Sequence, residues 1–256
     1  SYPSILPLTP FSRKWDAPIA LSHNRRIVGY EVLARWIKPD GSVVSPADFI
    51  PLAADAGWMP RLDWLMLTQA IAALEHFEGQ WLSVNVSGPT LFESGFGERL
   101  AEQLAGFFAR PEDLRLEISE SIAIGCSPVI QGSILDQLKN LAATDDAVGL
   151  LVDDYGSAYA HLLAIMRLCK EVPSVQAIKL VGDLVSGLDN DPSKLTICRN
   201  TIEMAHDLDL QVIAEGVETE AEALTLKFLR CDYLQGYHLG RPLPLSEYNL
   251  ETIATC

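Results

Sequence analysis

Short apolar segments alternate with amphipathic segments along most of this 256-residue chain, and this alternation limits the folds that it can adopt. The apolar segments resemble buried strands, and the segments between them carry apolar residues at helical spacing. The strands expected cover residues 18–21, 27–36, 81–86, 114–118, 148–152, 177–181, 211–215 and 233–237. Helices are expected from residue 45 and over residues 62–77, 98–108, 129–141, 159–169, 194–207 and 219–229.

Eight strands over a chain of this length favour a (β/α)8 barrel. Only residues 22–26 separate the first two strands, and because so short a link cannot hold a crossover helix, this pair must be an antiparallel hairpin. An open doubly wound sheet is the alternative, but the sequence around Gly95 and Gly97 lacks the third glycine of its phosphate-binding fingerprint. We therefore predict an α/β fold, a modified TIM (β/α)8 barrel with the first strand antiparallel. Residues 1–16 are expected to be a lead-in, and residues 17–256 a single domain.

The overall charge excludes several classes of partner. A formal net charge of −15 argues against DNA or a membrane surface, because the protein would repel polyanions. A small anionic ligand remains a possible partner if metal ions bridge it to carboxylates of the protein. No apolar run reaches membrane-spanning length, and the five cysteines form no CxxC pair, as is typical of a reducing compartment. We expect a cytoplasmic domain, cut from a longer protein or trimmed of a tag.

The apolar stretch 148–152 ends on two adjacent carboxylates, Asp153 and Asp154. A strand buried on both faces should not end this way unless something positive compensates the charges, and a divalent metal is the obvious candidate. The two side chains can share one site only if the strand stops between them and the chain turns, which Gly156 permits. A solvated strand end followed by a turn is the alternative interpretation.

Polar residues recur in the last part of six predicted strands, where the active sites of barrels form. Each residue taken singly is more readily explained as a satisfied structural group. Their recurrence at one end of successive strands favours a functional site instead. These residues are Asn85, Glu117, Asp153, Lys179, Glu215 and Gln235, and Glu31 lies in the middle of the second predicted strand.

The residue types indicate the chemistry. Carboxylate and amide oxygens form a hard ligand set that suits Mg²⁺ or Mn²⁺ and is poor for zinc. So many anionic groups could hold two metals about 3.5–4 Å apart, the spacing that supports in-line attack of water on phosphorus. Lys179 could position or deprotonate that water, and Glu215 could accept a proton or complete the shell of the second metal. The candidate ligands are Glu31, Asn85, Glu117, Asp153 and Asp154.

Six ordered motifs resemble the EAL domain family. They are EVLARW (31–36), SVNVS (83–87), LEISES (116–121), DDYGS (153–157), AEGVET (214–219) and QGY through RPLP (235–244). The resemblance runs from about residue 17 to residue 245. In that family, metal-dependent phosphodiesterases linearise the bacterial second messenger cyclic di-GMP to pGpG, so the resemblance implies a bacterial signalling domain with this hydrolase activity.

The resemblance also implies roles for single residues. Lys179 and Glu215 would serve the attacking water, with Gln235 nearby at the substrate, and Glu31 would be both catalytic and a metal ligand. The implied ligands of Mg²⁺ or Mn²⁺, two ions per site, are Glu31, Asn85, Glu117, Asp153 and Asp154.

Three further residues are assigned by motif position. Arg35 would pair with a substrate phosphate, a task that its forked guanidinium suits, and Leu33 would touch the nucleotide. Glu120 would anchor the loop after Asp154, which completes the metal site and often joins a homodimer contact.

The chain departs from the family pattern at four places. The family's Glu-Ala-Leu is Glu31-Val32-Leu33 here, Val181 replaces a carboxylate two residues after Lys179, Ala158 replaces a glycine, and Ala17 replaces a glutamine. None of these changes removes an implied metal ligand. A phosphodiesterase is therefore the favoured interpretation, and a receptor that binds cyclic di-GMP without cleaving it is the alternative.

Overall fold

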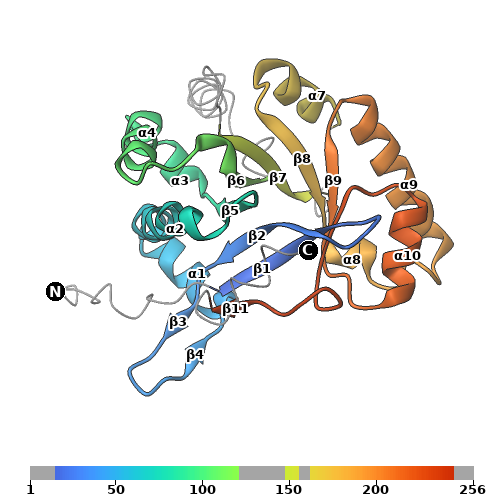
Figure 1. The fold of residues 1–256 in the computed structure, drawn as a ribbon, viewed down its shortest axis with the longest axis horizontal. Helices are drawn as coiled ribbons and strands as arrows, with labels where there is room; N and C mark the ends of the chain where they lie inside the picture. The colour runs from blue at the N-terminus through green and yellow to red at the C-terminus, as the bar shows by residue number, and fades with distance from the viewer. Residues whose placement is uncertain (1–14, 121–147, 156–161, 245–256) are drawn as a thin grey trace.

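Eight strands close into a barrel in the computed structural model, which describes residues 15–120, 148–155 and 162–244 (Figure 1). The strands follow the order β10-β9-β8-β7-β6-β5-β2-β1, and pairing of β10 with β1 closes the ring. Strand β1 is antiparallel to both of its neighbours, and the other strands are parallel to one another. The predicted barrel with a reversed first strand is confirmed. Its strands are β1 (Trp15–Leu21), β2 (Ile27–Leu33), β5 (Trp81–Asn85), β6 (Leu114–Ser119), β7 (Gly149–Tyr155), β8 (Val175–Leu180), β9 (Gln211–Ala214) and β10 (Tyr233–Gln235).

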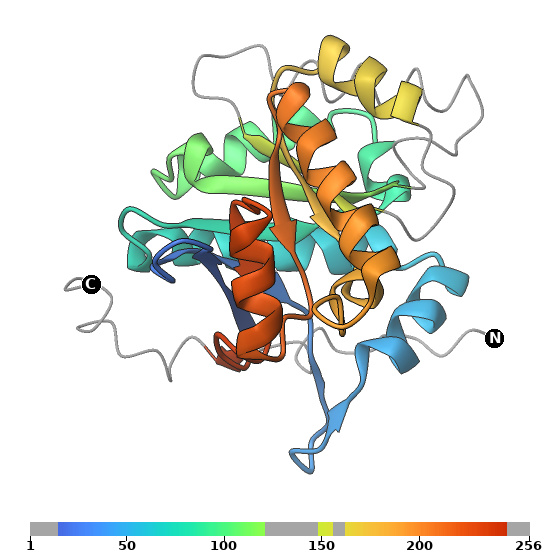
Figure 2. The same cartoon turned by 90° about the vertical axis from the view of Figure 1, so that its right-hand side faces the viewer.

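Helices cover the outside of the ring, and α9 and α10 lie side by side beyond β9 (Figures 1 and 2). The helices are α1 (Pro46–Asp55), α2 (Met59–Ala73), α3 (Gly88–Leu91), α4 (Phe96–Gly106), α7 (Leu162–Glu171), α8 (Gly182–Val185), α9 (Pro192–Asp207) and α10 (Glu220–Phe228). The helix expected over 129–141 lies outside the described residues. Within the described ranges, no helix combines the length and the apolar character needed to cross a membrane.

The second predicted strand was too long. Strand β2 ends at Leu33, and a small separate hairpin follows, made of β3 (Trp36–Ile37) and β4 (Val43–Val44). This hairpin projects from the barrel beside α1 (Figure 1). A further short strand, β11 (Leu243–Pro244), pairs with the start of β1. Neither feature was predicted, because two-residue strands carry too little periodicity to be recognised.

The barrel has two apolar cores. The larger one fills the space between the strands and the surrounding helices. A smaller cluster comprises Ile19, Trp81, Leu151, Ala177, Ile213 and Tyr233. Because side chains alternate along a strand, the residues two positions further along β5 and β8, Ser83 and Lys179, continue this inner face toward the carboxyl ends. The small cluster therefore forms an apolar floor beneath the polar end of the barrel.

Trp81 is the largest part of this floor, and Gly29 makes room for it. A Cβ atom on Gly29 would lie 2.4 Å from Cδ2 of Trp81, closer than any real contact. The Arg115 guanidinium stacks over the indole, 3.8 Å from the ring centroid. Tyr233 approaches the same ring edge-on, with centroids 6.4 Å apart. The floor is thus closed by a packed aromatic group, which leaves the opposite end of the barrel as the accessible one.

We predict that Gly29→Ala lowers the free energy of unfolding by about 1–3 kcal/mol, because the new methyl group must displace the indole of Trp81 in a filled interior. Urea denaturation measures this change. The matched control is Gly106→Ala at the end of α4, where a Cβ would meet nothing within 4 Å and the backbone φ is not positive. That control should leave stability unchanged or slightly raised, and equal losses in both variants would contradict the packing account.

Candidate functional site

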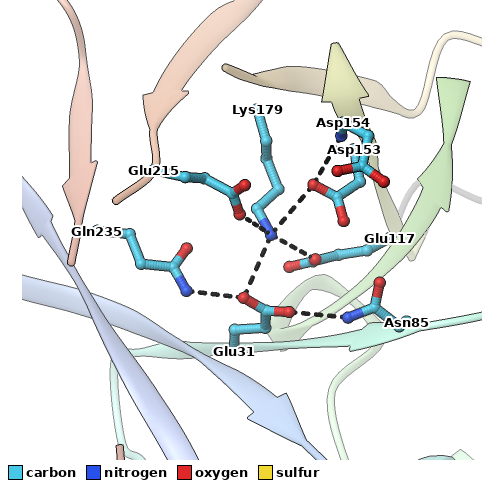
Figure 3. Close-up of polar contacts among 8 residues, drawn as sticks. All are labelled: Glu31, Asn85, Glu117, Asp153, Asp154, Lys179, Glu215 and Gln235. Atoms are coloured by element: carbon cyan, nitrogen blue, oxygen red, sulfur yellow. Dashed lines mark hydrogen bonds and ion pairs between the residues drawn. The ribbon is translucent and has the colours of Figure 1, made fainter. Parts of the chain in front are cut away.

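The parallel strands of the barrel all end at one rim, and this arrangement brings the predicted polar residues together. Strand pairing places Asn85 of β5 directly beside Glu117 of β6. Glu31, Lys179, Glu215 and Gln235 come from other strands or strand ends of the same ring and converge on one point (Figure 3). Residues separated by up to 204 positions in sequence are thereby hydrogen-bonded neighbours.

Lys179 lies at the centre of this group. Its side chain is completely buried. Its Nζ lies 2.6 Å from Glu117 Oε2 and 2.7 Å from Glu215 Oε1. The same atom lies 3.3 Å from Glu31 Oε2 and 3.5 Å from Asp153 Oδ1 (Figure 3). A single ammonium therefore organises carboxylates from four other strands or strand ends of the barrel.

Amide groups fix the orientation of Glu31. Asn85 Nδ2 donates to Glu31 Oε1 at 2.8 Å, and Gln235 Nε2 donates to Glu31 Oε2 at 2.7 Å. Burial by itself would raise the pKa of Glu31, but the charge of Lys179 and these hydrogen bonds hold it below its usual range. Glu31 is thus kept as a carboxylate, and Asn85 keeps its amide oxygen for another partner (Figure 3).

The rest of the cluster is short of positive charge. Four carboxylates against one ammonium leave three uncompensated negative charges within the cluster when all are ionised. Burial raises the pKa of Glu117 well above its usual range and also raises that of Asp153. Burial raises the pKa of Glu215 to about 7. Burial alone would lower the pKa of Lys179, but the charges of the same carboxylates together raise it well above its ordinary value. The cluster therefore favours the uptake of protons or of further cations.

The two adjacent aspartates are arranged differently from the prediction. A shared site was expected to need a strand that stops between Asp153 and Asp154, but β7 continues to Tyr155, and its pairing with β8 shifts register between Val152 and Tyr155. Asp154 has a φ of 59°, an unusual conformation for a residue other than glycine. Its backbone N–H donates to Asp153 Oδ1 at 2.9 Å, and its exposed side chain lies beside that of Asp153 (Figure 3). Both carboxylates therefore lie at the rim, as a shared site requires.

A pocket of about 410 Å³ opens next to the cluster. Asn85 and Glu117 line it, together with the two residues expected to bind substrate, Leu33 and Arg35. Helices α1 and α2 form its other, mainly apolar wall. Arg35 is half-buried, and burial lowers its pKa although Tyr237 and Glu31 oppose this. The pocket therefore joins an apolar wall and a cation to the acidic cluster.

Sequence reasoning missed Asp63, which also lines this pocket. Its Oδ2 accepts hydrogen bonds from the backbone N–H of Ser87 at 2.9 Å and from the hydroxyls of Ser87 and Thr90 at 2.5 Å each. Asp63 thereby ties α2 to the turn that follows Asn85. The available signal was a carboxylate between Leu62 and Trp64 on the core-facing side of a predicted helix.

Glu120, expected to anchor the loop after Asp154, is buried at the end of β6. Burial and then the nearby Glu120 raise the pKa of Tyr155, so Glu120 lies close to the end of β7. The loop itself falls in residues 156–161, outside the described part of the chain, as does Ala158. The anchoring role stays a prediction.

The chemistry of the cluster fits a divalent metal. Oε1 of Glu117 is buried and accepts no hydrogen bond from the described residues, so one carboxylate oxygen is left for another partner. Carboxylate and amide oxygens are the ligands that Mg²⁺ and Mn²⁺ prefer. The oxygens are gathered around Lys179, however, and no three acidic, histidine or cysteine side chains of the described ranges already form a cation cage. Binding of a metal would require these carboxylates to turn away from the ammonium.

The fold and this site define a TIM-type barrel with an acidic, lysine-centred cluster at the carboxyl ends of its strands. The chain belongs to the EAL domain family, which it matches over residues 17–242. It is 30% identical over 235 residues to MucR of Pseudomonas aeruginosa, a bifunctional diguanylate cyclase/cyclic di-GMP phosphodiesterase, covering 90% of this chain and 33% of MucR. A cyclic di-GMP phosphodiesterase of the same organism is 31% identical over 223 residues, covering 85% of this chain and 36% of the relative. This chain thus spans about a third of the length of these relatives.

Solved structures agree with this assignment. The phosphodiesterase of MucR in complex with c-di-GMP superimposes with a TM-score of 0.81 at 28% identity, covering 91% of this chain and 92% of the other. The EAL domain of FimX from Pseudomonas aeruginosa, bound to c-di-GMP, superimposes with a TM-score of 0.77 at 27% identity, covering 93% of each chain. The resemblance inferred from the motifs is therefore confirmed at the level of family and fold.

We predict that Lys179→Met lowers the free energy of unfolding of the metal-free domain by about 3–5 kcal/mol at neutral pH, because it leaves buried carboxylates without their cation. The loss should shrink as the pH falls. Carboxyl groups whose folded-state pKa lies above the unfolded value stabilise the fold at low pH and lose that contribution as the pH rises through the folded pKa.

Urea denaturation at several pH values measures both effects. The control is Arg167→Met, which removes the exposed ion pair between Arg167 and Glu171 and should change stability by less than about 1 kcal/mol. A Lys179→Met variant as stable as the wild type at neutral pH would show that the carboxylates do not depend on the ammonium.

Proposed function

We propose that this domain is a metal-dependent phosphodiesterase that hydrolyses cyclic di-GMP to linear pGpG. The observation that carries the proposal is the convergence of Lys179 and four carboxylates beside a pocket that contains a half-buried arginine. Such a site combines groups that can hold cations and water with a place for a phosphate. The phosphodiesterase activity of the relatives supports the same conclusion.

The pocket suits a cyclic dinucleotide. Its mainly apolar wall, formed by Met59 and Met66 of α2 and Ile50 of α1, offers a surface for a base. Leu33 lies on the strand side of the same pocket, and Arg35 provides a planar guanidinium that can bind a phosphate through two nitrogen atoms. These groups would hold a bound phosphodiester next to Glu117 and Asn85, which line the same pocket. The positive charge of Arg35 would thus let a protein with a net negative charge bind an anionic substrate.

Mg²⁺ or Mn²⁺, two ions per site, would be held by the oxygens of Glu31, Asn85, Glu117, Asp153 and Asp154. When bound, such ions supply positive charge to the phosphodiester and lower the pKa of the attacking water.

The chain's own residues then orient the reaction. Lys179 and Glu215, whose charged atoms are in direct contact at 2.7 Å, would lie side by side at the attacking water, with Lys179 orienting it and Glu215 receiving its proton. Gln235 and Asn85 hold Glu31 in place through their amide N–H groups. The apolar floor around Trp81 excludes bulk water from below and strengthens every charge interaction above it. These roles assign one task to each polar residue of the rim.

A cyclic di-GMP receptor that does not cleave its ligand is the second candidate. Two departures from the family pattern favour it: Val181 stands where that pattern carries a carboxylate, and Ala158 stands where it carries a glycine. In this alternative, Arg35 and the pocket would bind the nucleotide, and the acidic cluster would be structural.

The setting of the domain is part of the proposal. We place it in the cytoplasm, where the second messenger acts, as one unit of a larger signalling protein without contact to DNA or membrane. A homodimer through the loop after Asp154 is the proposed assembly.

We predict Mn²⁺- or Mg²⁺-dependent conversion of cyclic di-GMP to pGpG, which chromatography of the nucleotides measures. Glu117→Gln should lower kcat by about a hundredfold or more, because it removes a charged ligand with little change of shape. Removal of metal with EDTA should stop turnover, and adding Mn²⁺ should restore it. The control, Glu203→Gln on the exposed side of α9, should behave as the wild type.

Calorimetry separates the two candidates. A wild-type domain that binds cyclic di-GMP but forms no pGpG on long incubation with either metal is a receptor. A Glu117→Gln variant with the same kcat as the wild type would show that the acidic cluster does not have the proposed catalytic role.

A further inference from the structure

Glu222 is a buried carboxylate outside the rim, and it connects the two loops that follow strands β8 and β9. Glu222 is in the first turn of α10 and is only 4% exposed. Its Oε1 accepts a hydrogen bond from the backbone N–H of Gly187 at 2.8 Å. Its Oε2 accepts two more, from the backbone N–H groups of Glu218 and Thr219, at 2.9 Å each. Each oxygen of the carboxylate thus holds a different segment of backbone.

These two segments continue directly from the strands that carry the central ion pair. Gly187 follows α8, which follows β8 and Lys179. Glu218 and Thr219 follow β9 in the turn that begins at Glu215. Glu222 is therefore a direct link between the loop behind Lys179 and the loop behind Glu215.

The same two loops touch closer to the rim. Gly216 has a φ of +65°, and a Cβ there would lie 3.1 Å from Cα of Gly182. The backbone N–H of Glu215 donates to the carbonyl oxygen of Leu180 at 3.2 Å. The loops are thus in contact at their inner ends, and Glu222 joins them at their outer ends. Movement at the outer joint would be transmitted to Glu215 through a short, tightly packed segment.

Helix capping alone does not account for this arrangement. The side chain of Thr219 accepts the N–H of Glu222, and the bond from the N–H of Thr219 to Oε2 completes the capping box. The bond from Gly187 is additional and uses the other oxygen. Hydrogen bonds to an ionised carboxylate are stronger than neutral ones, and burial excludes competing water.

We propose that Glu222 is a positioning residue that holds Glu215 at its 2.7 Å distance from Lys179 by clamping the two loops together. Its effect on turnover rests on the proposed phosphodiesterase function, whereas its effect on the geometry of the loops does not. Glu222 itself touches neither substrate nor reacting atoms.

The experiment compares three variants of the whole domain. Glu222→Ala removes every bond of the clamp. Glu222→Gln keeps one acceptor oxygen, which can serve Glu218 and Thr219 but then presents an NH₂ group toward Gly187. The matched control is Asp191→Ala, because Asp191 also accepts two backbone N–H groups at a helix start, from Ser193 at 2.8 Å and Lys194 at 3.2 Å, but joins no loop behind Glu215.

Amide hydrogen exchange, a crystal structure and steady-state kinetics provide the readouts. In Glu222→Gln we expect faster exchange at Gly187, continued protection at Thr219, and a Glu215–Lys179 distance beyond the hydrogen-bond limit of about 3.2 Å. In Glu222→Ala we expect kcat to fall about tenfold while KM changes little, because orientation is lost but substrate contacts remain. Asp191→Ala should lower Tm by a similar amount and leave kcat unchanged.

Several results would overturn the proposal. Unchanged exchange at Gly187 or an unchanged Glu215–Lys179 distance in both Glu222 variants would show that Glu222 does not clamp the loops. An equal loss of kcat in Asp191→Ala would show that the effect is one of general stability. If the wild type forms no pGpG at all, the proposed function fails, and the exchange and distance measurements still decide the role of Glu222.

Discussion

The buried ammonium of Lys179 is the interaction on which the rest of the structure depends. A charge completely removed from water is tolerated only when it is paired and hydrogen-bonded, and Lys179 meets this requirement with carboxylates from four other strands or strand ends. Those carboxylates repel one another, so their close approach depends on the ammonium in turn. This mutual dependence requires the rim of the barrel to be assembled as one unit. An excess of negative charge remains, which further protons or cations would offset.

The remainder of the fold supports that arrangement from below and from outside. The apolar floor around Trp81 includes Ala177, two residues before Lys179 on the inner face of β8, and Gly29 is required because the indole fills the space that a side chain would occupy. Outside the ring, Asp63 fixes the turn after Asn85, and Glu222 fixes the turns after Lys179 and Glu215. Both are buried carboxylates that accept backbone N–H groups, so the site is positioned by the same chemical device on two sides of the barrel.

Much of this arrangement could be predicted from the sequence. Eight apolar segments with a polar residue near the end of most of them predicted both the barrel and the convergence of Asn85, Glu117, Lys179 and Glu215, because parallel strands end at one rim. The hairpin of β3 and β4 and the left-handed conformation of Asp154 could not be predicted, because features of only one or two residues leave no periodic pattern in the sequence. The role of Glu222 depends on its distance from Gly187, 35 residues away, which no local pattern contains. The ion pairs between Lys179 and the carboxylates were likewise not predicted, because the residue types alone do not show which buried charges will pair.

Anomalous diffraction from crystals of the domain grown with Mn²⁺ and a non-hydrolysable cyclic dinucleotide tests the central claim most directly. The account predicts Mn²⁺ in contact with Glu117 and Asn85 at the rim, with a phosphate of the ligand beside it and at least one carboxylate turned away from Lys179. Crystals that bind the nucleotide but show no Mn²⁺ at the rim, with all four carboxylates still on Lys179, would contradict it.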